Sequence, residues 1–399
     1  MQNRSDMLEQ NIIKQLCQNG TMSIADIASA VNASVPTTTK YLSILEKSGW
    51  VTNCGKSSSP HGRQPKLYTV CSESAYFLGV DPKHRALILS LMDFSGKTVA
   101  EREERISFEN TPEMMETICR KCQEFISDSG IPADKVKSAV FNISGRVDNR
   151  TGQSHTIFNF ENNDEPLGDI LSQRLGFKVL IDNDTRLMSY GELRHLGNHG
   201  FRNFLYVNVG WGIGLSIIID GKVYYGMNGF SGEFGHTYVY DNEIMCHCGK
   251  KGCLETEVSG RAICAQLKKR IENGETSSLR SRILKGAELD ENDVIDAAFR
   301  DDMLSIEVIE RAGSELGRHI ANLINLFNPE AVIIGGSMQA AGDMFISPLK
   351  LSVRRYSLRL ISQNVSINTS ALGEKSGCIG ACLKARDEML KVIGDKVLD

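Results

Sequence analysis

The residues best suited to chemistry lie in a glycine-rich stretch at positions 233–255, E-F-G-H-T-Y-V-Y-D-N-E-I-M-C-H-C-G-K-K-G-C-L-E. It contains a histidine and three cysteines with the spacing H-x9-C-x-C-x4-C: His236, Cys246, Cys248 and Cys253. Imidazole nitrogen and thiolate sulfur are the donors of a closed, tetrahedral structural zinc site. The alternative is a group of reduced or buried residues without a metal. We favour zinc, because a histidine and a third cysteine accompany the C-x-C pair.

Two carboxylates, Glu233 and Glu255, lie at the ends of the same stretch. A metal bound in this loop would fix the polar side chains beside it. The stretch therefore also predicts a site for a hydroxyl-rich ligand.

The composition is that of a folded protein without membrane insertion. The chain of 399 residues is long enough for two or three domains, and it is 41% hydrophobic and 24% charged. No apolar run approaches the roughly 20 residues that span a bilayer, and the polar N-terminus is unlike a secretory signal. Eleven cysteines, most of them scattered, are typical of reduced thiols. We expect a cytoplasmic protein.

Charge is distributed unevenly along the chain. Residues 1–70 carry seven Lys or Arg residues against four Asp or Glu, a net charge of +3, whereas the whole chain carries −4. A small basic region joined to a larger acidic body is consistent with a nucleic-acid-binding domain.

The basic region has the pattern of a helix-turn-helix. We expect helices at residues 11–17, 24–31 and 35–48, with Ser23 as an N-cap. The third helix would enter the major groove and present four polar residues to DNA: Thr37, Thr38, Thr39 and Lys40. Residues 51–70 predict a two-stranded wing, in which Arg63 and Lys66 are candidates for minor-groove or phosphate contact. The alternative is a small helical cap with an ordinary solvated face.

From about Ser74 the pattern changes to alternating strands and helices, an α/β region. G-V-D at 79–81 and V-N-V-G-W-G-I-G at 207–214 each lie at the end of an expected strand, as in two similar halves. Glycines at such strand ends let backbone N–H groups approach phosphate, although a loop of this kind is more often a tight turn.

Recognisable motifs extend over nearly the whole chain: the head, G-R-Q-P (62–65), S-G-R-V-D (144–148), I-D-N-D (181–184), G-W-G-I-G (210–214), S-G-E-F-G-H (231–236), C-H-C-G-K-K-G-C-L-E (246–255) and I-I-G-G (333–336). Together they resemble the repressor, open-reading-frame and kinase (ROK) family, in particular its sugar-responsive regulators of the N-acetylglucosamine and xylose repressor type. The resemblance implies an α/β architecture: a winged helix-turn-helix at 1–72, then a two-lobed, actin-like (ribonuclease H-like) sugar-kinase fold. The lobes would span 73–182 and 183–399, with the C-terminal helix returning to the first lobe.

By this resemblance a sugar would bind between the lobes through six side chains: Asn159, Asn183, Asp184, Glu233, His236 and Glu255. Asp184 would occupy the position of a kinase's general base. The alternative for Asp184 is a helix N-cap, because D-N-D-T-R precedes a helical run.

The resemblance also implies that the body is not an enzyme. Kinases of the family carry D-x-G-G-T in the first phosphate loop, and the matching residues here are Asp81-Pro82-Lys83-His84-Arg85. Proline supplies no N–H, and the added side chains fill space that phosphate needs. Trp211 in the second loop stands where these kinases usually have a small threonine.

The expected function is ligand-linked DNA binding with zinc as a structural cofactor. A homodimer or tetramer would bind a double-stranded operator, by family default as a repressor of carbohydrate genes. A hexose, an N-acetylhexosamine or a phosphorylated derivative would change its affinity. Two alternatives stay open: an ATP-dependent sugar kinase with an accessory DNA-binding head, and a regulator whose body responds to a sugar-transport protein.

Overall fold

Serine side chains begin two of the first three helices, and this capping explains where those helices start. The helices are α1 (Arg4–Asn19), α2 (Ile24–Ala30) and α3 (Val35–Lys47). The Ser23 hydroxyl accepts a hydrogen bond from the Asp26 N–H, and the Asp26 carboxylate accepts one from the Ser23 N–H, which forms a capping box. The Ser34 hydroxyl accepts a hydrogen bond from the Thr37 N–H. α1 begins well before the expected residue 11.

Three short strands complete this N-terminal head. They are β1 (Met22–Ser23), β2 (Val51–Lys56) and β3 (Lys66–Val70), which pair antiparallel in the order β1-β3-β2. The helices bury a shared apolar core that includes Ile12, Leu16, Ile27, Leu42 and Leu45. The arrangement is a winged helix-turn-helix, as the sequence predicts.

The computed structural model describes residues 4–56, 65–159, 165–197 and 200–391. The chain forms two units: unit 1 holds Met1–Leu187 and Gly377–Asp399, and unit 2 holds Met188–Ser376. Two helices cross these divisions, α6 (Asp184–Leu196) and α14 (Ser376–Leu390).

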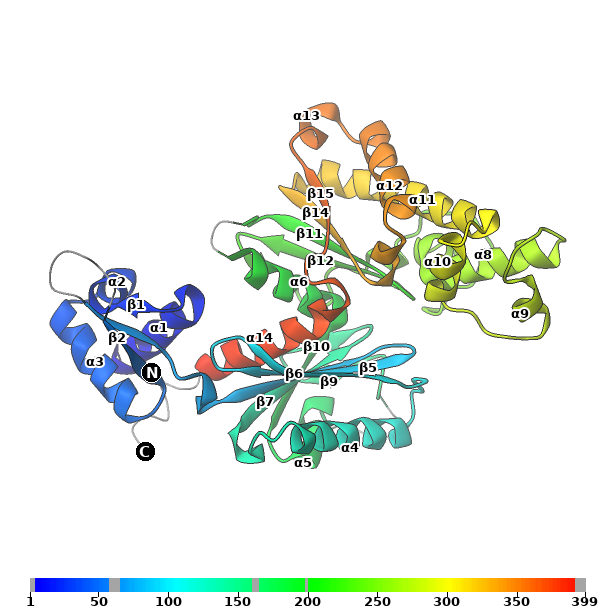
Figure 1. Ribbon diagram of the computed structural model, residues 1–399. Coiled ribbons are helices and arrows are strands. Elements are labelled where there is room, and N and C mark those ends of the chain that lie inside the picture. The colour runs from blue at the N-terminus through cyan, green and yellow to red at the C-terminus, as the bar shows by residue number, and fades with distance from the viewer. Residues whose placement is uncertain (1–3, 57–64, 160–164, 198–199, 392–399) are drawn as a thin grey trace. The chain divides into compact units, whose positions relative to one another are not determined.

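Unit 1 contains, besides the head, a five-stranded sheet in the order β10-β7-β4-β5-β6 (Figure 1). Its strands are β4 (Tyr76–Pro82), β5 (Ala86–Asp93), β6 (Thr98–Arg105), β7 (Val136–Ile143) and β10 (Lys178–Asn183). β4, β7 and β10 are parallel, whereas β4, β5 and β6 form an antiparallel meander. The helices α4 (Pro112–Asp128) and α5 (Leu167–Leu175) bury their apolar side chains against one face. A small pair, β8 (Val147–Asp148) and β9 (Gln153–Ser154), follows β7.

The helix α14 covers the opposite face of this sheet (Figure 1). Its approach to β4 is close, because a Cβ on Gly79 would lie 2.3 Å from the Cys378 carbonyl oxygen. The Cys378 thiol donates to the carbonyl oxygens of Gly79 and Ile88, and the Cys382 thiol donates to that of Ser90. α14 is thereby fixed to the two central strands.

Unit 2 repeats this strand pattern. Its sheet has the order β13-β12-β11-β14-β15, with β11 (Phe204–Val209), β12 (Ile213–Ile219), β13 (Lys222–Val223), β14 (Ala331–Gly335) and β15 (Ser366–Thr369). Again three strands are parallel and three form an antiparallel meander that shares the first strand, β11. This agrees with the similar halves that the sequence indicates.

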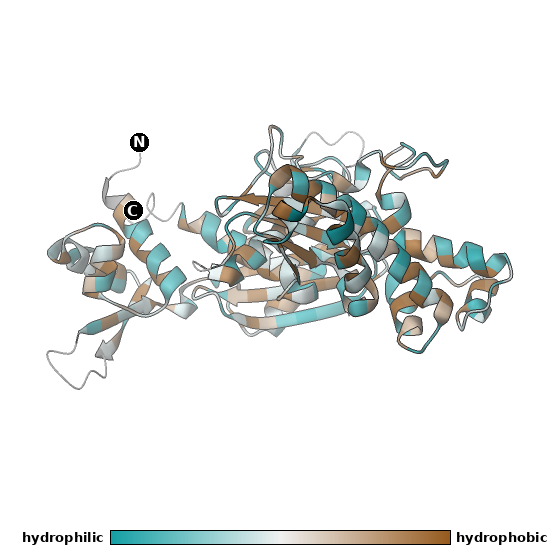
Figure 2. Cartoon of the chain, turned by 90° about the horizontal axis from the view of Figure 1, so that it is seen from above, coloured by the Kyte–Doolittle hydropathy of each residue, from teal (hydrophilic) through white to brown (hydrophobic). Residues whose placement is uncertain are grey.

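The remaining helices lie in unit 2, and most of them share one apolar core with its sheet. They are α7 (Glu255–Val258), α8 (Gly260–Glu272), α9 (Arg280–Leu284), α10 (Glu291–Ala298), α11 (Met303–Phe327), α12 (Asp343–Tyr356) and α13 (Arg359–Ser362). Figure 2 shows the resulting polarity, with mostly hydrophobic strands and helices that alternate hydrophobic and hydrophilic residues. In the part of the chain that the structure describes, no helix is long and apolar enough to cross a membrane.

Asp302 caps α11 and should make the free energy of unfolding depend on pH in the acid range. Its carboxylate accepts hydrogen bonds from the Ser305 N–H, the Ser278 N–H and the Ser277 hydroxyl. Burial alone would raise its pKa, but these bonds lower the pKa from 3.8 to about 2. Because the folded-state pKa is the lower one, the carboxylate stabilises the fold by about 2 kcal/mol above pH ~4, and this is lost as the pH falls to ~2. Asp302→Asn should therefore lower the free energy of unfolding in urea at pH 7 and flatten its dependence on pH in the acid range. Asp296→Asn in α10 is the matched control, and equal behaviour of the two variants would contradict the prediction.

Candidate functional site

A loop after β13 in unit 2 carries the metal-donor cluster. The 3-10 turn η4 (Phe234–His236) supplies His236, and the chain then folds back on itself through the paired residues Tyr238 with Cys253 and Met245 with Lys251. Gly252 permits this fold, since it has a φ of 76° and a Cβ there would lie 2.5 Å from the Tyr238 ring. The loop thus brings sequence-distant donors together.

The four predicted donors converge. The ligand atoms of His236, Cys246, Cys248 and Cys253 all lie within 4.8 Å of one another. The two sulfur atoms of Cys248 and Cys253 are 3.6 Å apart, and Cys246 Sγ lies 3.6 Å from His236 Nδ1. Donors 2.0–2.3 Å from a tetrahedral ion are separated by about 3.5–3.8 Å. The cluster could therefore hold a metal ion.

The two ring nitrogens of His236 face different neighbours. Nδ1 faces Cys246, whereas Nε2 lies 3.9 Å from Glu233 Oε2. A neutral imidazole can ligate a metal through one nitrogen and donate a hydrogen bond from the other. His236 can consequently serve both the cluster and a polar ligand, as its two predicted roles require.

Glu255 is buried and joins the metal-donor loop to the central sheet. Its Oε2 accepts a hydrogen bond from the Ile213 N–H at 3.0 Å, and its Oε1 lies 2.9 Å from both His247 Nδ1 and Arg261 Nη2. Burial would raise the pKa of this carboxyl, but the bonds from His247 and Ile213 and the Arg261 charge hold it below its usual value.

Sequence reasoning missed His247 and Arg261. Both are half-exposed and both contact the predicted ligand residue Glu255. The only signal for His247 is its place between Cys246 and Cys248, and a lone arginine in a helix such as Arg261 gives no signal at all.

The unit 1 residues form a separate hydrogen-bonded group at the end of β10. Asp184 accepts hydrogen bonds from the Ser144 hydroxyl at 2.8 Å and from its neighbour Asn183 at 3.0 Å. The side-chain oxygen Oδ1 of Asn183 accepts one from the Arg186 N–H, so the N-cap of α6 is Asn183. Asp184 is the first residue of the helix rather than its cap, and its carboxylate is half-buried.

Asn159 is exposed and does not belong to that hydrogen-bond network within the described chain. Of the six predicted sugar ligands, three lie in unit 1 and three in unit 2. Asn183 and Asp184 are adjacent within unit 1, and Glu233 lies beside His236 within unit 2. Glu255 is near the same cluster, with Oε1 3.9 Å from Cys246 Sγ.

The predicted DNA-facing residues differ in exposure. Thr37, Thr39 and Lys40 are exposed on α3, and Lys66 is exposed at the start of β3. Thr38 is wrongly predicted, because its side chain is buried and its hydroxyl donates to the Ser34 carbonyl oxygen. Helical periodicity explains the error: in a run of consecutive polar residues one side chain must face the core. Arg63 lies outside the described residues.

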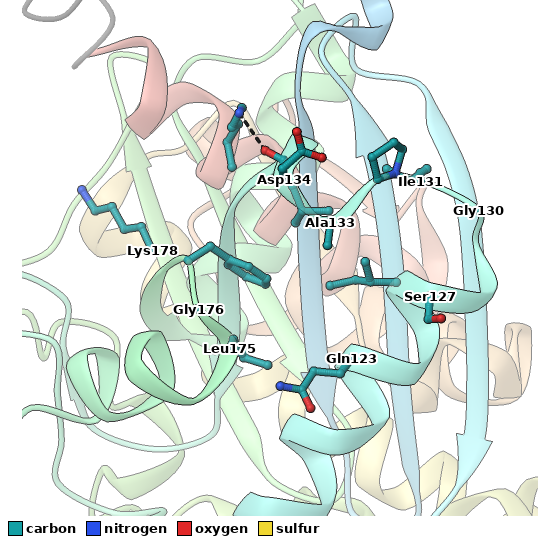
Figure 3. A pocket seen from close by; sticks show the side chains of 14 residues that line it. Gln123, Ser127, Gly130, Ile131, Ala133, Asp134, Leu175, Gly176 and Lys178 are labelled. Carbon is teal, nitrogen blue, oxygen red and sulfur yellow. Dashed lines mark hydrogen bonds between the residues drawn. The ribbon is translucent and has the colours of Figure 1, made fainter.

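A pocket of about 820 Å³ opens at the opposite end of the unit 1 sheet (Figure 3). Its lining includes Gln123, Ser127, Asp134, Lys137 and Lys178. Lys178 begins β10, whereas the predicted ligand Asn183 ends it. In open α/β sheets ligands bind at the carboxyl ends of parallel strands, and we therefore do not assign this pocket to the candidate site.

Comparison with known families matches both parts of the chain. The ROK family model matches residues 78–388. The winged helix-turn-helix DNA-binding model matches residues 6–52.

Known relatives match either the whole chain or the body alone. The xylose repressor of Caldicellulosiruptor bescii is 28% identical over 387 residues, covering 95% of each chain. The crystal structure of a ROK family transcriptional regulator, a homologue of the E. coli Mlc protein, superposes with a TM-score of 0.80 and 25% identity over 99% of this chain and 98% of the other. A ROK family glucokinase from Streptomyces griseus, solved with glucose and AMPPNP, gives a TM-score of 0.67 and 26% identity over 78% of this chain and 99% of its own.

A buried ion pair supports the Asn183–Asp184 group, and breaking it should destabilise the fold. Arg186 Nε donates to Asp182 Oδ1 at 2.7 Å, and both side chains are almost fully buried. Asp182→Asn removes one counter-charge from a buried guanidinium, so the free energy of unfolding should fall by about 3 kcal/mol. Urea unfolding measures this. The matched control is Asp128→Asn, which removes an exposed pair with Arg102 and should cost less than about 1 kcal/mol; equal costs would contradict the prediction.

Proposed function

Because the chain belongs to the ROK family, we propose that it is a sugar-responsive transcriptional regulator, most simply a repressor of carbohydrate genes. The observation that carries this proposal is the winged head: the match to the xylose repressor and to the regulator structure includes it, whereas the match to the glucokinase covers only 78% of the chain.

On the DNA side, α3 enters the major groove and the wing follows the backbone. The proposed contacts are Thr37, Thr39, Lys40 and Lys66, together with Arg63 of the wing. A homodimer or tetramer places two heads on adjacent half-sites and gains avidity from the linkage.

On the ligand side, a hexose, an N-acetylhexosamine or a phosphorylated derivative binds the polar residues of the body. Asp184 and Glu233 carry the acceptors, His236 Nε2 donates, and Asn159, Asn183 and Glu255 complete the set. Support comes from geometry within each unit: the Asp184 carboxylate is held by Ser144 and Asn183, and Glu233 is beside His236. Fixed acceptors and donors of this kind suit sugar hydroxyls.

Zinc is the metal proposed for the cluster. Three thiolates and one imidazole match the soft, four-coordinate preference of structural zinc. The ion would brace the loop that carries Glu233 and His236.

The body is proposed to lack kinase activity. At the matching position of the kinases' first phosphate loop, β4 runs through Asp81 and Pro82 into a tight turn closed by the Lys83 N–H on the Ala86 carbonyl oxygen at 2.7 Å. Such a turn offers side chains rather than a cradle of free N–H groups.

The route from ligand to head runs through α14 and the turn after β5. α14 starts where the chain leaves unit 2, and its last turn reaches the head, since Gln10 Nε2 donates to the Lys391 carbonyl oxygen at 2.9 Å. The buried ring of Phe94 lies 5.2 Å from Trp50 of the head and 6.3 Å from Phe77 of β4, between ring centroids. Movement of α14 or this turn would therefore reposition the head.

The proposed function is tested by fluorescence anisotropy of the protein on DNA from upstream of its own gene, across a panel of sugars and sugar phosphates. We expect one sugar to change the affinity about 5–150-fold.

Asp184→Asn should keep operator binding but raise the sugar concentration for half effect about 10–100-fold, because a charged acceptor is lost. The control, Asp220→Asn, should respond normally. DNA binding indifferent to every sugar would favour a protein effector such as a sugar-transport component, and no DNA binding with ATP turnover would favour the kinase.

Removal of one thiolate tests the metal. Cys248→Ala should lower the zinc content measured by elemental analysis and abolish the sugar response, because the loop is no longer braced. Operator affinity without sugar should remain. Cys264→Ala, a thiol outside the cluster, is the control; a normal sugar response in zinc-free protein would refute the bracing role.

Truncation of the Phe94 ring, which contacts both the head and β4, tests the proposed route from ligand to head. Phe94→Leu should reduce the sugar effect on operator affinity about 2–30-fold, because the head loses its aromatic contact. Sugar affinity measured by calorimetry without DNA should stay the same. Phe125→Leu makes the same change within the core of unit 1, and loss of coupling in both variants would mean general destabilisation instead.

A further inference from the structure

Unit 2 carries an exposed surface that combines leucines with arginines, on the end of α11 and on α12 and α13. We call it the α12–α13 face. Its exposed leucines are Leu326 (77%), Leu351 (66%), Leu358 (63%) and Leu360 (80%). Single exposed leucines are ordinary, but large clusters of apolar side chains on a surface mark sites of interaction.

These residues belong to one packed group of helices. α11 and α12 are in close contact, because a Cβ on Gly317 would lie 2.3 Å from the Leu349 carbonyl oxygen. The Leu358 N–H donates to Asn325 Oδ1 at 2.9 Å, which ties the start of α13 to the end of α11. Figure 1 shows α13 directly after α12 at one end of unit 2.

The same face is basic. Lys350, Arg354, Arg355 and Arg359 are exposed, and the segment 343–362 that contains them has a single acidic residue, Asp343. Within the described part of the chain, none of these four cations forms an ion pair, and Arg355 lies over the Tyr356 ring at 5.5 Å. Residues 71–399 as a whole are acidic, since the chain carries −4 and residues 1–70 carry +3. The four cations are thus concentrated in one part of a region whose net charge is negative.

We propose that the α12–α13 face binds the surface of an anionic lipid membrane. Clustered Lys and Arg side chains are attracted to anionic headgroups, and exposed aliphatic side chains enter the boundary with the acyl chains. This is peripheral binding and requires no spanning helix. Membrane binding would inhibit DNA binding only if one molecule cannot hold both partners at once.

Charge and residue type favour a membrane over the other occupants. A second copy that met this face across a two-fold axis would oppose cations with cations. Flanking DNA would satisfy the cations but leave the four leucines in water.

The test is co-sedimentation of the full chain with vesicles of equal parts phosphatidylcholine and phosphatidylglycerol, and with pure phosphatidylcholine vesicles. Binding should occur with the anionic vesicles only and fall with added salt. Each basic side chain near such a surface contributes roughly fivefold in partitioning, so Arg354→Gln with Arg355→Gln should weaken binding about 25-fold. Leu358→Ser with Leu360→Ser should also weaken it.

The matched control is Leu284→Ser with Lys285→Gln, which removes one exposed leucine and one exposed lysine at the end of α9. It should bind vesicles like the unsubstituted chain. Because the basic head is unchanged in the control and in the face variants, any vesicle binding by the head contributes equally to all of them. All variants should keep the far-UV circular dichroism spectrum and the urea unfolding midpoint of the unsubstituted chain, as evidence that they fold. The proposal is overturned if anionic vesicles are not bound, or if the face variants bind them normally. Loss of oligomers in sedimentation velocity without loss of vesicle binding would assign the face to a second copy, and loss of operator affinity alone would assign it to DNA.

Discussion

The close contact between α14 and β4 is the constraint on which unit 1 depends. Gly79 has no side chain, and a Cβ there would collide with the Cys378 carbonyl oxygen. At this distance the Cys378 and Cys382 thiols reach strand carbonyl oxygens and act as weak donors. One face of the sheet is thus covered by a helix from the far end of the chain, and that helix also touches the head through Lys391. α14 therefore connects the head to the sheet of unit 1.

In unit 2 the side chain of Glu255 makes comparable connections between separate elements. It bonds the Ile213 N–H on β12, and its other oxygen meets His247 in the cysteine loop and Arg261 on α8. A buried carboxylate is tolerated only when its oxygens are satisfied in this way. The cysteine loop, the unit 2 sheet and α8 are consequently held together by one side chain. The metal-donor cluster and the polar residues beside it should therefore move together.

The sequence allowed the prediction of features that depend on local pattern. Helix caps such as Ser23, the two strands beside the wing and the convergence of four metal donors all follow from residue type and spacing, and the structure contains them. Features that depend on packing were not predictable. The burial of Thr38 follows from which way α3 faces its core, and the contact of Arg261 with Glu255 follows from the turn between α7 and α8. The capping role of Asn183 instead of Asp184 turns on a shift of one residue, which sequence patterns do not determine.

The return of α14 to unit 1 has a consequence for synthesis on the ribosome. Residues 188–376 must be made before the helix that covers the first sheet emerges. At 5–20 residues per second this takes about 10–40 s. During that interval the β4–β5 surface that later receives Cys378 and Cys382 lacks its helix cover. Unit 2, whose chain is continuous, can complete its fold first, so the N-terminal DNA-binding head gains its contact with Lys391 only after unit 2 has been synthesised.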